Sequence, residues 1–81
     1  MTEPEIYAAL TEIFRELFNR DNMVLTPELS AKDVKGWDSF RQVEIVLATE
    51  EWFGIKLHAR DLDRQRNVGD LAAVIARKLG G

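Results

Sequence analysis

The sequence predicts an all-α fold, a small bundle of three long helices and one short helix, with a long loop between the first and second helices. Apolar residues recur at three- and four-residue steps over three separate stretches, as they do along one face of a helix. Helix start and stop residues flank each stretch, and no stretch shows the pattern of paired strands. The 81 residues are expected to form one domain, 1–81, around a single core.

The first helix is expected from about residue 3 to 19. Thr2 can cap it, Pro4 suits the first turn, and Glu5 stands three residues after Thr2, as in a capping box. The apolar face that follows consists of Ile6, Ala9, Leu10, Ile13, Phe14, Leu17 and Phe18. Polar residues from position 19 onward end the periodic pattern.

Residues 20–37 show no sustained periodicity and are expected to form the long loop. The segment 26–29 predicts a turn or a short helical start, and Gly36 predicts a second turn. A long loop in a compact domain needs side chains that hold it in place. The candidates are Val24, Leu25, Leu29, Val34 and Trp37.

The second helix is expected to open at Asp38 or Ser39 and to run to about Phe53, with Gly54 as the residue that ends it. Its apolar positions are Phe40, Val43, Val46 and Leu47, with Ile45, Ala48, Trp52 and Phe53 beside them. Residues 55–57 predict a short extended exit. We interpret both tryptophans, Trp37 and Trp52, as packing residues.

Two helices are expected in the last third of the chain. Residues 59–65 predict the short one, which would carry Leu62. The last long helix follows Asn67 as its cap, ends at Gly80, and has Arg77 and Lys78 in its final turn, where cations suit the helix dipole. Its buried face is expected to hold Val68, Leu71, Val74, Ile75 and Leu79.

Composition excludes several function classes. The chain has no cysteine and one histidine, His58, so disulfides, thiolate metal sites and a cysteine nucleophile are ruled out and no metal site is expected. The net charge is −3 and the pI about 5.1, which argues against nucleic acid as a partner. No apolar run is long enough to span a membrane, and the N-terminus is acidic. We therefore expect a cytoplasmic monomer that has no membrane partner.

Ser39 lies in the sequence Gly36-Trp37-Asp38-Ser39-Phe40, midway along the chain. Serine at a helix start is commonly only a cap. Here, however, the helix that follows ends in Glu50-Glu51-Trp52-Phe53-Gly54-Ile55, and Val68-Gly69-Asp70 opens the last helix. With this spacing the chain resembles, over almost its whole length, the acyl carrier protein family, whose pattern is Asp-Ser-Leu, a Glu-rich helix end and Phe-Gly-Ile.

The resemblance implies that Ser39 accepts 4′-phosphopantetheine from coenzyme A, in a reaction catalysed by a separate phosphopantetheinyl transferase. Asp38 is then a candidate to position the Mg²⁺ of that transferase, since hard cations prefer carboxylate oxygen. The chain itself would have no catalytic activity. It would hold an acyl group as a thioester on the arm, whose thiol the chain lacks.

The resemblance also implies that the second helix is the surface recognised by acyl-loading and acyl-transferring enzymes with basic docking patches. The candidate recognition residues are Arg41, Glu44, Leu47, Glu50 and Glu51. Charge pairing at such a surface increases the encounter rate and fixes orientation more than it adds affinity.

Three residues depart from the pattern of general fatty-acid carriers. Arg41 replaces an acidic or small polar residue, whereas Thr49 and Gln65 stand where apolar side chains usually face the core. Polar groups without partners make an apolar acyl site costly. We therefore expect a short or polar cargo in a specialised pathway, with no long chain enclosed along Val43, Val46, Leu62 and Leu71.

Alternatives stay open at this point. Within the family, the cargo could be an amino acid, an aryl acid or a polyketide. Outside it, the chain could be an unmodified helical interaction module in which Ser39 is only a helix cap. A small hydrolase that uses Ser39 is disfavoured, because Asp38 is its direct neighbour and no histidine is evidently placed as a base.

Overall fold

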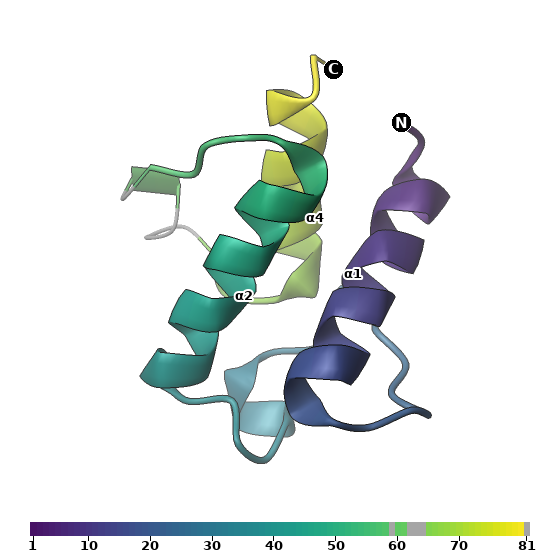
Figure 1. Cartoon of the computed structure of the whole chain (residues 1–81), viewed down its shortest axis with the longest axis vertical. Coiled ribbons are helices and arrows are strands. Elements are labelled where there is room, and N and C mark those ends of the chain that lie inside the picture. The colour runs from purple at the N-terminus through teal and green to yellow at the C-terminus, as the bar shows by residue number, and fades with distance from the viewer. Residues whose placement is uncertain (59, 62–64, 81) are drawn as a thin grey trace.

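The computed structural model describes residues 1–58, 60–61 and 65–80, and these contain helices and loops but no strand (Figure 1). The elements are α1 (Glu3–Phe18), the short 3₁₀ helix η1 (Ala31–Asp33), α2 (Ser39–Phe53) and α4 (Val68–Lys78). The all-α prediction is confirmed. The short helix predicted over 59–65, with Leu62, falls largely outside the described residues, and η1 was not predicted.

The residues predicted to start and end the long helices do so. Glu5 Oε1 accepts a hydrogen bond from Thr2 N at 2.8 Å, and Thr2 Oγ1 accepts one from Glu5 N, so the capping box of α1 is complete. Asn67 Oδ1 accepts from Asp70 N at 2.9 Å and caps α4. Gly54 ends α2 in the left-handed conformation, with φ of 65°. At the C-terminal end of α1, Asn19 takes a similar conformation, so α1 ends one residue before the predicted boundary.

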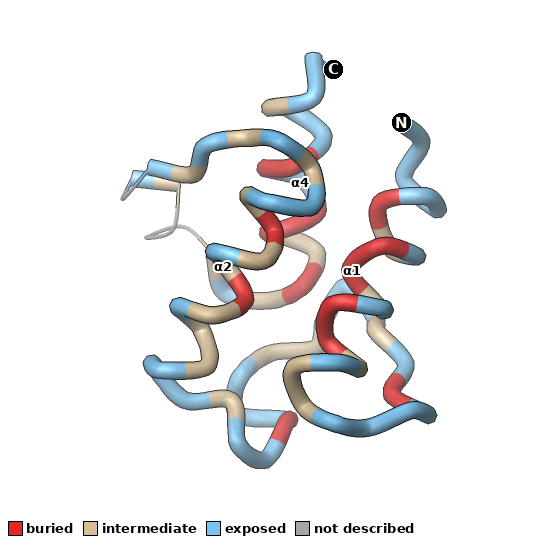
Figure 2. The backbone as a smooth tube through the Cα atoms, in the orientation of Figure 1, coloured by how far each residue is buried: buried red, intermediate tan, exposed pale blue. Residues whose placement is uncertain are grey.

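The core lies where α1 packs against both α2 and α4, and Figure 2 shows the buried residues on the sides of these helices that face one another. α1 and α4 provide most of it, because both have a continuous apolar face. Of the face predicted for the last helix, only Leu79 is exposed. The central residues are Ile6, Leu10, Phe14, Ile45, Val68, Leu71 and Ile75.

The loop between α1 and α2 is held by side chains and by backbone hydrogen bonds. Val34 is buried, whereas Val24 is 70% exposed, so the prediction that Val24 anchors the loop is wrong. Met23 is buried instead, and its carbonyl oxygen accepts a hydrogen bond from Arg15 Nε at 2.8 Å. Each residue of an extended chain points opposite to its neighbour, so only one of Met23 and Val24 can face the core.

The start of α4 is attached to the same loop. The Val68 amide donates to the Leu29 carbonyl and the Gly69 amide donates to the Pro27 carbonyl, both at 2.9 Å. These amides have no acceptor within their own helix. The predicted turn at 26–29 is present, closed by a bond from Leu29 N to Thr26 O. The loop therefore completes the first turn of α4.

The apolar face predicted for α2 needs correction. Phe40, Val43 and Leu47 are exposed, with Phe40 at 72%, whereas Ile45 and Thr49 are fully buried. Apolar residues lie almost all around α2, so periodicity alone does not determine the buried side. Trp52 is also 56% exposed, so its interpretation as a packing residue is wrong, while Trp37 packs against the core as expected. α2 therefore carries both a narrow buried stripe and an exposed apolar face.

Among the described residues, no helix combines the length and the apolar character that crossing a membrane requires.

Candidate functional site

Ser39 is the first residue of α2, and its side chain is exposed to solvent. The cap of the helix is its neighbour: Asp38 Oδ1 accepts a hydrogen bond from Arg41 N at 2.8 Å. The interpretation of Ser39 as the helix cap is therefore wrong, because Asp38 already holds the cap position. Within the described residues the Ser39 hydroxyl makes no hydrogen bond, so the structure of the helix start does not depend on it.

The surroundings of Ser39 suit an attached phosphodiester. The first amides of a helix point out of its end and lack partners within it, and the helix dipole places partial positive charge there. At α2 the Asp38 carboxylate occupies only the Arg41 amide, whereas the amides of Ser39 and Phe40 have no acceptor within the described part of the chain. A phosphate oxygen linked to Ser39 Oγ would lie beside these donors.

Trp37, the residue before Asp38 and Ser39, determines how the chain enters α2. The Trp37 ring meets the edge of Phe14 at 5.2 Å between ring centroids, and its Nε1 donates to Gln42 Oε1 at 2.7 Å. One contact joins the segment to α1 and the other joins it to the first turn of α2. Ser39 is therefore presented at a defined point of the surface.

Arg41 and Glu44, both predicted as recognition residues, lie together. Arg41 Nη1 is 2.6 Å from Glu44 Oε1, and the guanidinium carbon lies 5.7 Å from the centroid of the Phe18 ring. Arg41 thus connects α2 to the end of α1 and neutralises part of the acidic surface. Arg41, which replaces the acidic or small polar residue of general fatty-acid carriers, therefore has a structural role.

The other three predicted recognition residues have different surroundings. Glu50 Oε2 accepts a hydrogen bond from Leu57 N at 2.8 Å, which attaches the segment after α2 to the helix. Leu47 is 58% exposed, and Glu51 is exposed one turn further on. Phe40 and Val43 precede Leu47 at helical spacing, so the three form an exposed apolar row. The sequence contained this row, but its outward direction was not foreseen.

The interior behind α2 contains polar atoms without partners. Thr49 Oγ1 is fully buried and, among the described residues, has no hydrogen-bond partner, and the same holds for Gln65 Nε2. The inward position predicted for Thr49 is therefore confirmed. A cavity of about 70 Å³ lies beside Gln65 and Trp37. Its remaining lining residues are Ala31, Gln42, Arg66, Asn67 and Leu71.

Comparison with known proteins agrees with this geometry. The family model described as phosphopantetheine attachment site matches residues 8–75. The chain is 40% identical over 76 residues to the meromycolate extension acyl carrier protein of Mycolicibacterium smegmatis, covering 94% of this chain and 77% of the relative. It is 34% identical over 76 residues to the acyl carrier protein of Thermotoga maritima, covering 94% of each chain.

A solved structure also superposes on the chain. It is the solution NMR structure of the holo acyl carrier protein from Geobacter metallireducens, with a TM-score of 0.87 and 40% sequence identity. The superposition covers 91% of this chain and 85% of that one. Fold and sequence therefore point to the same family.

Proposed function

The chain belongs to the acyl carrier protein family, and we propose that Ser39 is the residue to which its 4′-phosphopantetheine is attached. Family membership makes the chain a non-catalytic carrier with a covalently attached arm, whose thiol holds the acyl group as a thioester. The observation that carries the assignment to Ser39 is its position: an exposed hydroxyl at the start of α2, next to a cap that does not need it.

The residues around Ser39 support this proposal. In the transfer from coenzyme A, Ser39 Oγ would lose its proton and bond to the phosphorus of the pantetheine phosphate. The pyrophosphate bond of coenzyme A would break, and adenosine 3′,5′-bisphosphate would leave together with the proton. The unpaired amides at the start of α2 would stabilise the anion that results. We also propose that Asp38 positions the Mg²⁺ of the transferase. Oδ1 of Asp38 accepts the Arg41 amide, so the second carboxylate oxygen, Oδ2, would be the one to contact the Mg²⁺.

Intact-mass measurement tests the attachment site. The purified chain is incubated with coenzyme A and a broad-specificity phosphopantetheinyl transferase, and we expect the mass of one phosphopantetheinyl group to be added. Ser39→Ala should remain unmodified while keeping its helical circular dichroism spectrum.

The chain offers a matched control, because Ser30 is its only other serine. Ser30 Oγ lies 3.1 Å from Asp33 Oδ2 in the capping box of η1. Ser30→Ala should be modified to the same extent as the parent chain. A mass increase that persists in Ser39→Ala would show that the attachment site is elsewhere.

We propose that partner enzymes with basic patches dock on the exposed side of α2, at Glu44 and Leu47. Leu47 continues the apolar row that starts beside Ser39, and Glu44 and Glu51 lie one turn on either side of it. We propose that Arg41, predicted as a recognition residue, limits the acidic charge here through its pair with Glu44. Leu47→Ala should slow modification by the transferase without changing the melting temperature. Glu50→Ala should slow modification and also lower the melting temperature, because Leu57 N loses its acceptor.

We propose that the cargo is short or polar and that the pathway is a specialised one. The buried Thr49 and Gln65 atoms support this, because a long alkyl chain enclosed behind α2 would cover these unpaired polar atoms. The meromycolate extension relatives are named for a dedicated pathway. We also propose that the carrier is a cytoplasmic monomer.

An acyl-loading experiment tests the cargo. An octanoyl group on the arm should shift amide resonances mainly near Trp37 and Phe40. Large shifts at Ile45, Val46 and Leu71 would mean that the chain enters the core, and the prediction of a short or polar cargo would be wrong.

A further inference from the structure

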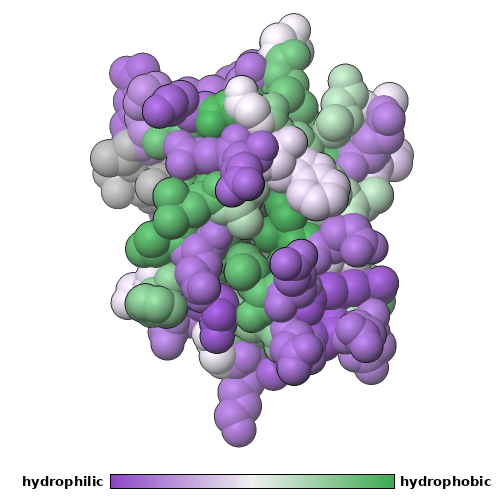
Figure 3. Space-filling model, in the orientation of Figure 1, coloured by the Kyte–Doolittle hydropathy of each residue, from purple (hydrophilic) through white to green (hydrophobic). Residues whose placement is uncertain are grey.

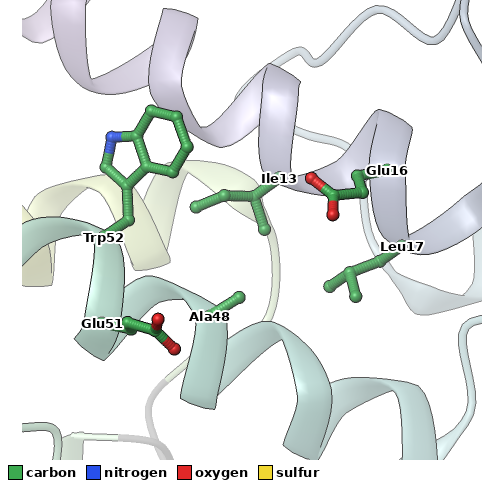
Figure 4. A pocket seen from close by; sticks show the side chains of 6 residues that line it. All are labelled: Ile13, Glu16, Leu17, Ala48, Glu51 and Trp52. Atoms are coloured by element: carbon green, nitrogen blue, oxygen red, sulfur yellow. The ribbon is translucent and has the colours of Figure 1, made fainter.

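A groove between α1 and α2 lies beside the docking surface proposed above and shares Glu51 with it. It has a volume of about 380 Å³ and is lined from α1 by Ile13, Glu16 and Leu17 and from α2 by Ala48, Glu51 and Trp52. Figure 4 shows Trp52 pointing from α2 towards α1 and Leu17 pointing from α1 towards α2. Figure 3 shows hydrophobic surface between these helices with hydrophilic surface around it. The groove is therefore apolar at its base and polar at its edges.

The charges at the edges have one sign. Glu16 and Glu51 are exposed carboxylates, one on each helix, and none of the six lining residues is basic. Within the described residues neither carboxylate takes part in a salt bridge. The nearest base along α1, Arg15, directs its Nε to the Met23 carbonyl. In the described part of the chain, the two carboxylates of the groove thus have no cationic partner, and they lie beside an exposed indole.

This combination fits a particular type of side chain. Lysine and arginine carry an apolar stem that can lie on Ile13, Leu17 and Trp52, and a cationic head that can reach a carboxylate at the edge. The face of a tryptophan ring also attracts cations. We propose that the groove binds a basic amphipathic helix of a partner protein, whose apolar face covers Trp52 and whose lysine or arginine residues pair with Glu16 and Glu51.

The position of the groove gives the proposal its functional meaning. At a rise of about 1.5 Å per residue, Ala48 and Trp52 lie about 14 and 20 Å along α2 from Ser39. A helix bound at that distance would leave the start of α2, with Ser39 and Phe40, uncovered. The groove would thus hold the carrier to one protein while the Ser39 end serves another.

Binding of a synthetic probe tests the groove. The probe is a fluorescein-labelled amphipathic peptide helix with leucines on one face and lysines beside them, measured by fluorescence anisotropy. We expect it to bind, and we expect amide shifts on ¹⁵N-labelled protein to concentrate at Ile13, Leu17 and Ala48 and at the Trp52 indole. Glu16→Gln should weaken binding about two- to fivefold, as for one exposed ion pair. Trp52→Ala should weaken it about tenfold, as for an aromatic anchor.

Matched controls separate the groove from general charge attraction. Glu12→Gln removes the same charge from the same helix outside the groove, and Leu47→Ala removes an exposed apolar residue from the outer side of α2. Both should change probe affinity less than about twofold. The proposal is overturned if the probe does not bind, if Glu12→Gln weakens binding as much as Glu16→Gln, or if Leu47→Ala weakens it as much as Trp52→Ala.

Two further measurements identify other outcomes. If sedimentation shows dimers that Trp52→Ala dissociates, the groove binds a second copy of the chain, and the proposal of a basic partner is wrong. Phosphopantetheine transfer to Glu16→Gln and Trp52→Ala should proceed as for the parent chain. Because that reaction needs Ser39 and not the groove, a failed probe experiment leaves the assignment of Ser39 unaffected.

Discussion

Adjacent side chains at the start of α2 have separate tasks. Asp38 stabilises the helix through its bond to the Arg41 amide, and Ser39 presents an exposed hydroxyl that the helix does not use. If Ser39 carries the arm as proposed, the modified residue and the capping residue are different residues. Modification of Ser39 therefore need not disturb the cap of the helix.

Unfolding experiments can separate the two roles. Asp38→Ala removes the cap and should lower the free energy of unfolding by about 1 kcal/mol. Ser39→Ala should change it by less than about 0.5 kcal/mol, because an exposed substitution away from a cap has little effect. Urea denaturation followed by circular dichroism measures both values. An equal loss in the two variants would show that Ser39 shares the capping role.

Thr49 is the residue at which the sequence most clearly lowers the stability of the fold. Its hydroxyl is fully buried without a partner in the described part of the chain, and such a group costs about 1–3 kcal/mol. Thr49→Val keeps the shape and removes the hydroxyl. It should raise the free energy of unfolding by about 1 kcal/mol. If the variant is less stable than the parent in urea denaturation, Thr49 has a hydrogen bond that the structure does not show.

Residue-level prediction from the sequence succeeded where a local pattern defines the answer. Thr2 was predicted from its spacing to Glu5, and Asn67 from its residue type directly before a helical pattern, and both caps are present. The outward direction of Trp52 and Val43 depends on where α1 lies against α2, which no local pattern contains. The Glu50 bond to Leu57 N was missed for the same reason, since it needs the chain to turn back after Gly54.

At the scale of elements, the loop and the start of α4 form one unit. The Pro27 and Leu29 carbonyls accept the first two amides of α4, so the backbones approach closely. A Cβ added to Gly69 would lie 3.0 Å from the Pro27 carbonyl oxygen and 3.2 Å from the Pro27 Cβ. Glycine at this helix position is explained by that lack of space.

Gly69→Ala tests this close approach. In an open helix position alanine is more stable than glycine by about 1 kcal/mol. Here the side chain would push the 27–29 turn away and weaken two hydrogen bonds, so we expect a loss of about 1 kcal/mol instead. Ala73→Gly, at an exposed site of α4, provides the ordinary helix effect for comparison. A gain in stability for Gly69→Ala would show that the turn yields without cost.

The elements themselves could be predicted better than their connections. α1 and α4 have strong helical periodicity and clear end signals, so their boundaries were predicted to within about a residue. The attachment of the 26–29 turn to α4 could not be predicted, because its partner atoms are about half a chain apart. η1 is different, because its capping box joins Ser30 and Asp33 and is a local signal that was missed. At the site, the sequence predicts Ser39 and Asp38, and the structure shows that Asp38 caps the helix.

For the whole molecule, charge is distributed unevenly along the chain. Residues 1–55 contain eleven acidic and five basic residues, whereas residues 56–81 contain three acidic and six basic ones. Asp61 lies between these basic groups and pairs with Lys78 Nζ at 3.1 Å. Partners of opposite sign can therefore approach different parts of the same small carrier.

Stability should fall in acid because two carboxylates bind protons less readily in the folded chain. The Thr2 amide and hydroxyl lower the pKa of Glu5, and the His58 amide, with Lys78 beside it, lowers the pKa of Asp61. The unfolded chain then binds more protons as the pH drops below their usual values of 4.5 and 3.8. This part of the stability is present above those values and disappears as the pH falls through the lower folded-state pKa values.

Thermal unfolding between about pH 5 and pH 3 measures this effect. The melting temperature of the parent chain should fall over this range, and the fall should be smaller for Glu5→Gln combined with Asp61→Asn. Gln keeps the capping-box geometry while removing the titrating group. An unchanged fall in the double variant would assign the acid sensitivity to other carboxylates.

The attachment of α4 to the long loop also determines when its first amides can exchange with solvent. The Val68 and Gly69 protons are held by Leu29 and Pro27, so they become accessible when the loop leaves α4, even while the helix stays formed. Their hydrogen-exchange rates therefore report the opening of the loop, with the Leu71 and Ile75 amides as reporters of α4 itself. Binding of any partner that presses the loop against α4 should slow exchange at these two amides first, even if it touches neither.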